Sequence, residues 1–149
     1  PILHWQLTAF STRQLDINAW SDLKPFKVGY ERGMTIIAEH SELNLLPANS
    51  IESAILQASM GRVDVLLNDD FTTRYNLRRM GVENLIANPT PLAPGPAFHL
   101  LNSKHQKLAE QLNAVLLEMT ANDRIRQIKD EVIEDFMRKA EQEYRQEQP

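Results

Sequence analysis

Apolar and polar residues alternate in short blocks through the first ninety positions, and each block has the length of a strand or a short helix. Strand-like patterns occur at residues 2–10, 26–30, 44–46, 63–67 and 82–87. Helical patterns separate them, at residues 19–23, 34–40, 51–58 and 71–80. The run 63–67 is almost wholly apolar, which is typical of a strand buried on both faces of a parallel sheet. This alternation predicts an α/β domain with a parallel sheet covered by helices.

The pattern changes after residue 88, where a proline-rich stretch predicts a linker. Residues 97–101 are strand-like, and Ser103 with Gln106 matches a capping box at the start of a helix. Two amphipathic helices follow, separated near Asn122, and the polar tail beyond Met137 is expected to fray. The chain thus divides into a hinge strand at 1–12, a lobe at 13–95, and a return hinge strand with two closing helices at 96–149, of which 138–149 is the fraying tail.

Composition narrows the classes of function. The 149 residues carry a formal net charge of −4, so no overall positive field would attract nucleic acid. The sequence has no membrane-spanning apolar run and does not begin like a secretory signal, so it predicts no membrane insertion. The absence of cysteine excludes disulfides and thiolate metal sites, and is compatible with both cytoplasm and periplasm. A start on a strand-like run favours a piece cut from a longer protein.

Two short segments are candidate binding sites because each follows a predicted parallel strand, where open α/β sheets bind ligands. In the first, Gly33 permits a tight turn, and the helix start at Met34 and Thr35 could hold a carboxylate or phosphate. In the second, Asp69 or Asp70 could meet an ammonium group. Each has a plainer explanation, since glycine is common in turns and aspartate commonly caps the following helix.

Enzymatic and metal-dependent functions find little support. The four histidines never occur four residues apart as in a helical zinc site, and the motifs of serine hydrolases, nucleotide-binding loops and dinucleotide-binding folds are missing. Paired carboxylates in the last predicted helix alternate with lysine and arginine, which is typical of a solvated face. The sequence therefore predicts no cofactor, no metal and no catalytic residue.

Three segments, taken in order, resemble the amino-acid-binding type of type II periplasmic solute-binding protein. The segment 20–24 (WSDLK), the turn 27–35 (KVGYERGMT) and the strand 61–69 (GRVDVLLND) are similar to that family's motifs. Residues 98–105 resemble the crossover back from the second lobe, which two closing helices follow. The resemblance covers most of the chain, but the family's first lobe, with its carboxylate-clamping arginine, has no counterpart here.

The resemblance implies a fold, a site and a function. It implies a lobe that binds an amino acid or related polar solute without catalysis, as the periplasmic component of an ABC importer with a permease partner. Thr35 and the turn at Gly33 would hold a carboxylate and Asp69 an ammonium group, whereas Met34 replaces the family's hydroxyl residue and weakens the case for an amino acid. Arg32 could favour an anion, although a solvated arginine is the plainer interpretation. The alternative function is an extracytoplasmic sensor domain of a signalling protein, and enzymatic activity is a third class.

The two closing helices carry apolar stripes that the family would cover with its first lobe. Without that lobe, we expect these stripes to pack on the chain's own lobe or on a second copy of the chain in a homodimer.

Overall fold

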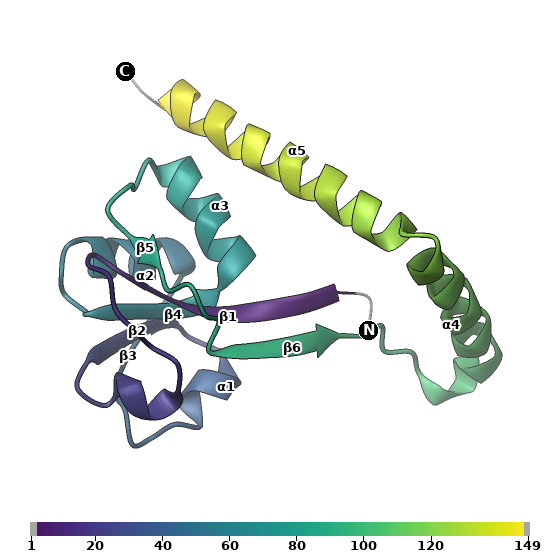
Figure 1. The fold of residues 1–149 in the computed structure, drawn as a ribbon, viewed down its shortest axis with the longest axis horizontal. Coiled ribbons are helices and arrows are strands. Elements are labelled where there is room, and N and C mark those ends of the chain that lie inside the picture. Colours follow the sequence, from purple (N-terminus) through teal and green to yellow (C-terminus); the bar gives the residue numbers. More distant parts are fainter. Residues whose placement is uncertain (1–2, 148–149) are drawn as a thin grey trace.

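The computed structural model describes residues 3–147, arranged as a sheet with helices around it and two long helices beside it that meet at an angle (Figure 1). Residues 1–2 of the expected hinge strand and residues 148–149 of the expected tail lie outside the described part. The first half contains β1 (Leu3–Ser11), a 3₁₀ turn (Trp20–Leu23), β2 (Lys27–Glu31), α1 (Thr35–Ala38), β3 (Asn44–Ala48) and α2 (Ile51–Ser59). The second half contains β4 (Val65–Asp69), α3 (Asp70–Met80), β5 (Ile86–Ala87), β6 (Ala93–Ala97), a second 3₁₀ turn (Ser103–His105), α4 (Gln106–Ala121) and α5 (Arg124–Glu147).

The strands form one mixed sheet in the order β3-β2-β4-β1-β5, with β6 also paired to β1. Strand β2 lies parallel to both β3 and β4, as the strand and helix alternation predicts. Strand β1 runs antiparallel to β4, and β5 and β6 run antiparallel to β1. The α/β fold is confirmed, with its parallel part made of β3, β2 and β4. Strands β1 and β6 enter and leave this part side by side (Figure 1).

The central strand β4 is covered on both faces, as its apolar run predicts. Leu66 and Leu67 are both fully buried, and they belong to different clusters. Leu67 packs with the residues that line α1 and the first 3₁₀ turn, whereas Leu66 packs with α2 and Phe10. Burial of apolar side chains on both faces is the main favourable term that fixes the sheet between its helices.

Strand β6 corrects the prediction of a linker at 88–96 followed by a strand at 97–101. The strand instead lies at Ala93–Ala97, and residues 98–102 have no regular structure. Proline is tolerated there because β6 pairs with β1 alone, so Pro94 and Pro96 need not donate to a second neighbour. Gly95 lies opposite Trp5, and a side chain at this glycine would overlap the indole ring. Close packing of an aromatic ring on an edge strand thus explains a strand in a proline-rich sequence.

The helix ends mostly follow the sequence signals. Ser50 caps α2 by accepting a hydrogen bond from the Ser53 amide, and Gly81 ends α3 in the left-handed conformation. The capping box expected at Ser103 and Gln106 is wrong, because Asn102 is the capping residue and accepts from the Lys104 amide. The cap therefore lies one residue earlier than predicted.

The polar tail after Met137 is helical through Glu147, which corrects the expectation that it frays. Helix α5 packs along α3, where Ala140 is fully buried and Arg78 forms an ion pair with Glu141. The Tyr144 ring lies directly over Gly81 at the end of α3. These contacts between two helices explain why a sequence without a continuous apolar stripe remains ordered. Of the two expectations for the closing helices, α5 follows the first, because it packs on the chain's own lobe.

Candidate functional site

The two candidate segments leave the sheet at the same edge. Strands β2 and β4 are parallel neighbours, and Tyr30 is paired with Leu67. Two residues further along these strands are Arg32 in β2's exit and Asp69 at the end of β4. The turn at Gly33 follows Arg32, and helix α3 follows Asp69. The carboxyl ends of adjacent parallel strands thus place Asp69 beside the turn that contains Gly33, as the sequence predicts.

Asp69 caps helix α3 with one of its two carboxylate oxygens. Oδ1 accepts hydrogen bonds from the backbone nitrogen and from Oγ1 of Thr72, both at 2.8 Å. The backbone carbonyl of Asp69 accepts a third bond, from Thr73 Oγ1, at 2.8 Å. Oδ2 has no hydrogen-bond partner within residues 3–147. The capping role therefore uses only half of the carboxylate, and the other oxygen is left to accept from another group.

Asp70, the other aspartate of the pair, has a structural partner. Its Oδ2 forms an ion pair with Arg74 Nε at 2.8 Å, one turn further along α3. This geometry is the stabilising i, i+4 arrangement of a helix surface. Of the two aspartates that the sequence left as alternatives, Asp69 lines the cavity at this end of the sheet and Asp70 does not.

The turn after β2 is tight and ends in a helix of a single turn. Gly33 has a φ of 102°, a conformation that favours glycine, and the Met34 amide donates to the Glu31 carbonyl. The Met34 side chain packs against the core cluster of Leu7 and Val28, whereas Thr35 is exposed at the first position of α1. The Met34 side chain is therefore occupied by packing, and its backbone amide and carbonyl are occupied by hydrogen bonds within the turn and α1.

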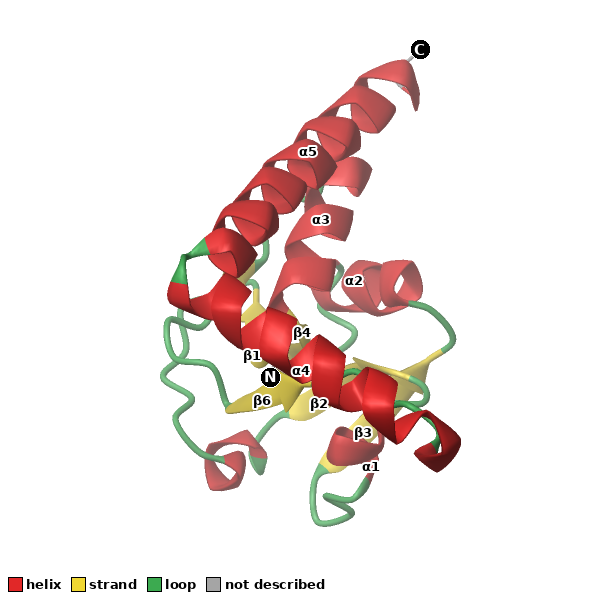
Figure 2. Cartoon of the chain, turned by 90° about the vertical axis from the view of Figure 1, so that its right-hand side faces the viewer, coloured by secondary structure: helices red, strands yellow, loops and turns green. Residues whose placement is uncertain are grey.

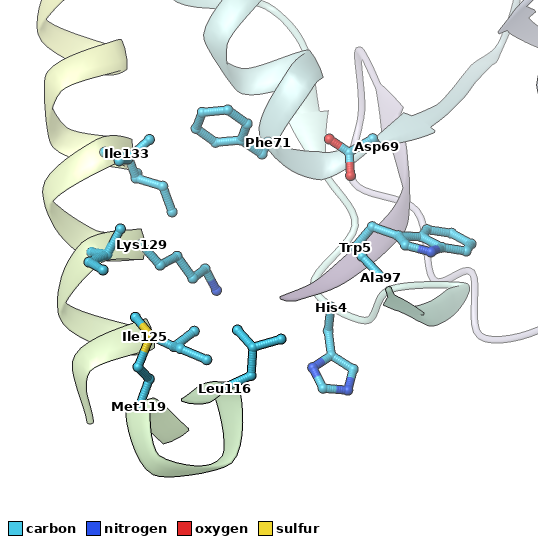
Figure 3. A pocket seen from close by; sticks show the side chains of 12 residues that line it. His4, Trp5, Asp69, Phe71, Ala97, Leu116, Met119, Ile125, Lys129 and Ile133 are labelled. Atoms are coloured by element: carbon cyan, nitrogen blue, oxygen red, sulfur yellow. The ribbon is translucent and has the colours of Figure 1, made fainter. Parts of the chain in front are cut away.

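A cavity of about 420 Å³ adjoins Asp69 (Figure 3). Its first wall consists of residues from the sheet and α3: His4, Trp5, Asp69, Phe71 and Ala97. Its second wall consists of residues from α4 and α5: Leu116, Met119, Ile125, Ile128, Lys129, Val132 and Ile133. Figure 2 shows α4 crossing in front of the strands, which accounts for this second wall. A volume of this size is within the range of pockets that hold small molecules, roughly 300–1,000 Å³.

The cavity brings together only part of the predicted site. Asp69 lines it, whereas Gly33, Met34 and Thr35 do not. Phe71, which directly follows the two aspartates, and Lys129 of α5 were not predicted as site residues. An aromatic residue beside a candidate carboxylate is a signal that could have indicated Phe71. Lys129 lies in a helix whose charges look like a solvated face, and only the docking of α5 places it here.

Comparisons with known proteins give a result at the level of the fold. No protein-family model and no curated protein sequence matches the chain. Among solved structures, a histidine kinase sensor domain described as similar to periplasmic binding proteins matches with a TM-score of 0.69 at 15% identity, over 86% of this chain and 58% of that one. The GluR0 ligand-binding core in complex with L-glutamate matches with a TM-score of 0.65 at 19% identity, over 93% of this chain and 61% of that one.

A third match is the periplasmic binding protein of an arginine transport system from Legionella pneumophila, with a TM-score of 0.62 at 20% identity, over 88% of this chain and 62% of that one. The chain has the fold of a type II solute-binding protein lobe. It spans about three fifths of the length of these type II structures. In type II folds, as in open α/β sheets generally, the carboxyl edge of the parallel strands is the expected ligand side, and Asp69 lies there.

Two features are absent from residues 3–147 of this lobe. No group of three or more histidine, aspartate and glutamate side chains in this range is arranged to hold a metal ion. None of the helices in the same range combines the length and apolar character that crossing a membrane requires.

Proposed function

We propose that the chain binds an amino acid or a related small polar solute, without catalysis, at the carboxyl ends of β2 and β4. The observation that carries this proposal is the unused Oδ2 of Asp69 at the edge of a type II solute-binding fold. A carboxylate held rigidly by Thr72 and half-buried can form a short charge-assisted hydrogen bond with an ammonium group.

The other predicted residues would complete the site. In this proposal the Thr35 hydroxyl and the backbone amides of Gly33 and Thr35 bind a carboxylate of the solute, and Met34 holds the turn in place through its packing against the core. The space beside Gly33 is open, because a Cβ there would meet no atom within 4 Å. A ligand could therefore come close to the backbone of this turn. The single-turn length of α1 makes its dipole small, so the hydroxyl and amide groups would supply most of the interaction.

We infer a transport role in which a longer protein, located in the periplasm, closes around the solute and presents itself to the permease of an ABC importer. Strands β1 and β6 lie side by side and would be the two connections about which such closure occurs. The arginine-transport neighbour supports this role. The net charge of −4 makes nucleic acid a poor partner.

The alternative role is ligand sensing at the start of a signalling pathway. It is favoured by the likeness to a histidine kinase sensor domain, whose TM-score of 0.69 is slightly above those of the amino-acid-binding neighbours described above. Both roles use the same ligand site. They are separated by what the full gene encodes: a kinase or cyclase module favours sensing, and neighbouring permease genes favour transport.

A homodimer remains the proposal for the apolar residues that α3 does not cover. Leu108, Val115 and Leu117 of α4 are 45%, 51% and 63% exposed. Light scattering that gives the mass of one chain at all concentrations would contradict the dimer, and twice that mass would support it.

A thermal-shift screen against amino acids, amines and small carboxylates tests the ligand proposal. A ligand at about 100 times its dissociation constant stabilises the folded chain by roughly 2.7 kcal/mol, which raises the melting temperature by several degrees. We expect amines and amino acids to give such shifts and Asp69→Ala to abolish them. An unchanged shift in Asp69→Ala would remove this carboxylate from the site.

A further inference from the structure

Two buried polar side chains lie opposite each other in the sheet, one residue before Asp69. Asn68 of β4 is paired with Thr8 of β1 in the antiparallel ladder, and each is only 2% exposed. Side chains of directly opposite residues point to the same face of a sheet. Since successive residues alternate between the two faces, this pair shares the face of Leu66 and Phe10, which α2 and α3 cover.

The amide group of the Asn68 side chain holds the backbone of Asp69. Its Oδ1 accepts a hydrogen bond from the Asp69 backbone nitrogen, at 2.8 Å. Asp69 is the last residue of β4 and the cap of α3, so this bond fixes the backbone from which the carboxylate projects. The bond exists only while the oxygen of the Asn68 amide faces Asp69, because the amide nitrogen is a donor and cannot accept from a backbone N–H.

The orientation of the Asn68 amide depends on what faces its nitrogen. Asn68 Nδ2 and Thr8 Oγ1 are buried, and neither has a hydrogen-bond partner within residues 3–147. The nitrogen is a donor and the hydroxyl oxygen can accept, and buried polar groups are rarely left unpaired because their desolvation is costly. Since the two residues are partners in the ladder, rotation about a side-chain bond would let each supply what the other lacks.

We propose that Asn68 is a positioning residue for Asp69, and that the hydroxyl group of Thr8 keeps the Asn68 amide in the orientation that holds the Asp69 backbone. A flipped amide would turn Nδ2 toward the Asp69 N–H and break the bond, whereas a hydrogen bond from Nδ2 to Thr8 Oγ1 opposes the flip. The effect on binding rests on the proposed function, because it assumes that Asp69 contacts the ligand. Neither Asn68 nor Thr8 lines the cavity, so both would act on affinity through Asp69.

The test compares the unaltered chain with Asn68→Leu, Thr8→Val and Thr8→Ser. Leucine and valine keep the approximate shape of the side chains they replace and remove the polar atoms, whereas serine keeps the hydroxyl group. Asn76→Leu is the matched control: Asn76 is also buried, at 6% exposed, and its Nδ2 donates to the Thr72 backbone carbonyl rather than contacting Asp69. A circular dichroism melt of each variant verifies that it is folded.

Hydrogen exchange of the Asp69 amide, taken as a ratio to exchange of the Leu66 amide, measures the positioning without a ligand. The ratio cancels a general loss of stability, because global opening exposes both amides. We expect Asn68→Leu to raise the ratio about tenfold or more and Thr8→Val to raise it about threefold or more, since each removes a buried hydrogen bond. Thr8→Ser and Asn76→Leu should keep the ratio within about twofold of the unaltered chain.

Isothermal titration with L-arginine, which offers an ammonium group to Asp69, measures the consequence for binding. We expect Asn68→Leu and Thr8→Val each to weaken the affinity about threefold or more, because a less ordered Asp69 loses more freedom when it binds. Thr8→Ser and Asn76→Leu should leave the affinity within about twofold of the unaltered chain.

The outcomes that contradict this inference differ from those that contradict the proposed function. An unchanged exchange ratio in Asn68→Leu would overturn the positioning role of Asn68, and equal ratios in Thr8→Ser and Thr8→Val would overturn the role of the Thr8 hydroxyl. Raised ratios with an unchanged affinity for L-arginine would overturn the effect on binding while the proposed function stands. If the unaltered chain binds neither L-arginine nor any compound of the thermal-shift screen, the proposed function and the effect on binding both fail. The exchange ratios then still decide whether Asn68 and Thr8 hold the Asp69 backbone.

Discussion

Asp69 and Thr72 are joined by two hydrogen bonds that end on the same carboxylate oxygen. The backbone nitrogen and Oγ1 of Thr72 each lie 2.8 Å from Asp69 Oδ1. The helix cap and the proposed ligand contact therefore use different atoms of one side chain. A residue that caps a helix in this way is also held in one orientation, which lowers the entropic cost of binding a ligand.

Thr72→Val tests whether this orientation matters for binding. The substitution removes the Oγ1 bond and keeps the backbone bond, so Asp69 becomes freer to rotate. We expect a loss of about 1 kcal/mol in the free energy of unfolding and a several-fold weaker affinity for an amine ligand. Urea denaturation measures the first effect and isothermal titration the second.

Thr73→Val is the matched control. Thr73 Oγ1 donates to the backbone carbonyl of Asp69, at 2.8 Å, and not to its carboxylate. Its loss should destabilise the chain by a similar amount and leave ligand affinity unchanged. Equal affinities of both variants would mean that Thr72 has no part in positioning the carboxylate.

Phe136→Ala should release α5 from the lobe. The Phe136 ring lies edge-to-face with Phe71 and Tyr75, with centroids 6.0 and 5.9 Å apart, and each such pair contributes about 0.5–1.5 kcal/mol beyond burial. Hydrogen exchange should become faster along α5 in the variant. Phe98→Ala, which removes a phenylalanine that is 61% exposed, should leave exchange in α5 unchanged. Slow exchange in Phe136→Ala would mean that α5 is ordered by other contacts.

Gly81→Ala and Gly61→Ala separate backbone strain from the docking of Tyr144. Both glycines end helices at positive φ, 64° and 71°, where alanine costs about 1–2 kcal/mol. A methyl group at Gly81 would also overlap the Tyr144 ring, whereas one at Gly61 meets nothing within 4 Å. Gly81→Ala should therefore lower the urea midpoint more than Gly61→Ala does. In a Tyr144→Ala background this difference should disappear, and its persistence would place Tyr144 away from α3.

The lowered pKa of Glu52 should make stability depend on pH. A hydrogen bond from its own amide, one from Ser50 and the nearby Arg79 guanidinium hold the pKa of Glu52 below its ordinary value of 4.5. A lowered pKa means that ionised Glu52 stabilises the fold above about pH 4.5, and that this contribution is lost as the pH falls through the lowered pKa.

Glu52→Gln measures this contribution. Since the Glu52 side chain is 43% exposed, solvent screening keeps its effect to roughly 0.3–1 kcal/mol at pH 7. The difference in urea midpoint between Glu52→Gln and the unaltered chain should shrink as the pH falls below 4.5 and through the lowered pKa of Glu52. Glu118→Gln, on an exposed part of α4, is the control and should show no such difference. A difference that grows on acidification would contradict the sign of the pKa shift.

The sequence predicted the parts of the fold that depend on local pattern. The apolar run around Leu66 indicates a two-sided strand because a short, almost wholly apolar run is typical of a strand that is buried on both faces of a parallel sheet. Gly81 identifies a helix end because few other residues adopt its conformation. The edge location of Gly33 and Asp69 followed from chain order, since parallel strands present the same ends together.

The remaining features depend on contacts between distant segments. Strand β6 forms in a proline-rich sequence because Gly95 receives the ring of Trp5, about ninety positions earlier. The polar end of α5 is ordered because Ala140 and Tyr144 meet α3. Lys129 joins the cavity of Asp69 only through that docking. None of these pairings has a signature within a short window of sequence.

We propose above that Asp69 and the turn at Gly33–Thr35 bind one ligand together. Amide chemical shifts of the ¹⁵N-labelled chain, recorded during titration with the strongest ligand from the thermal-shift screen, test this claim most directly. We expect the signals of Asp69, Gly33 and Thr35 to move with the same dissociation constant. Movement of only one of the two segments, or movement confined to other residues, would contradict it.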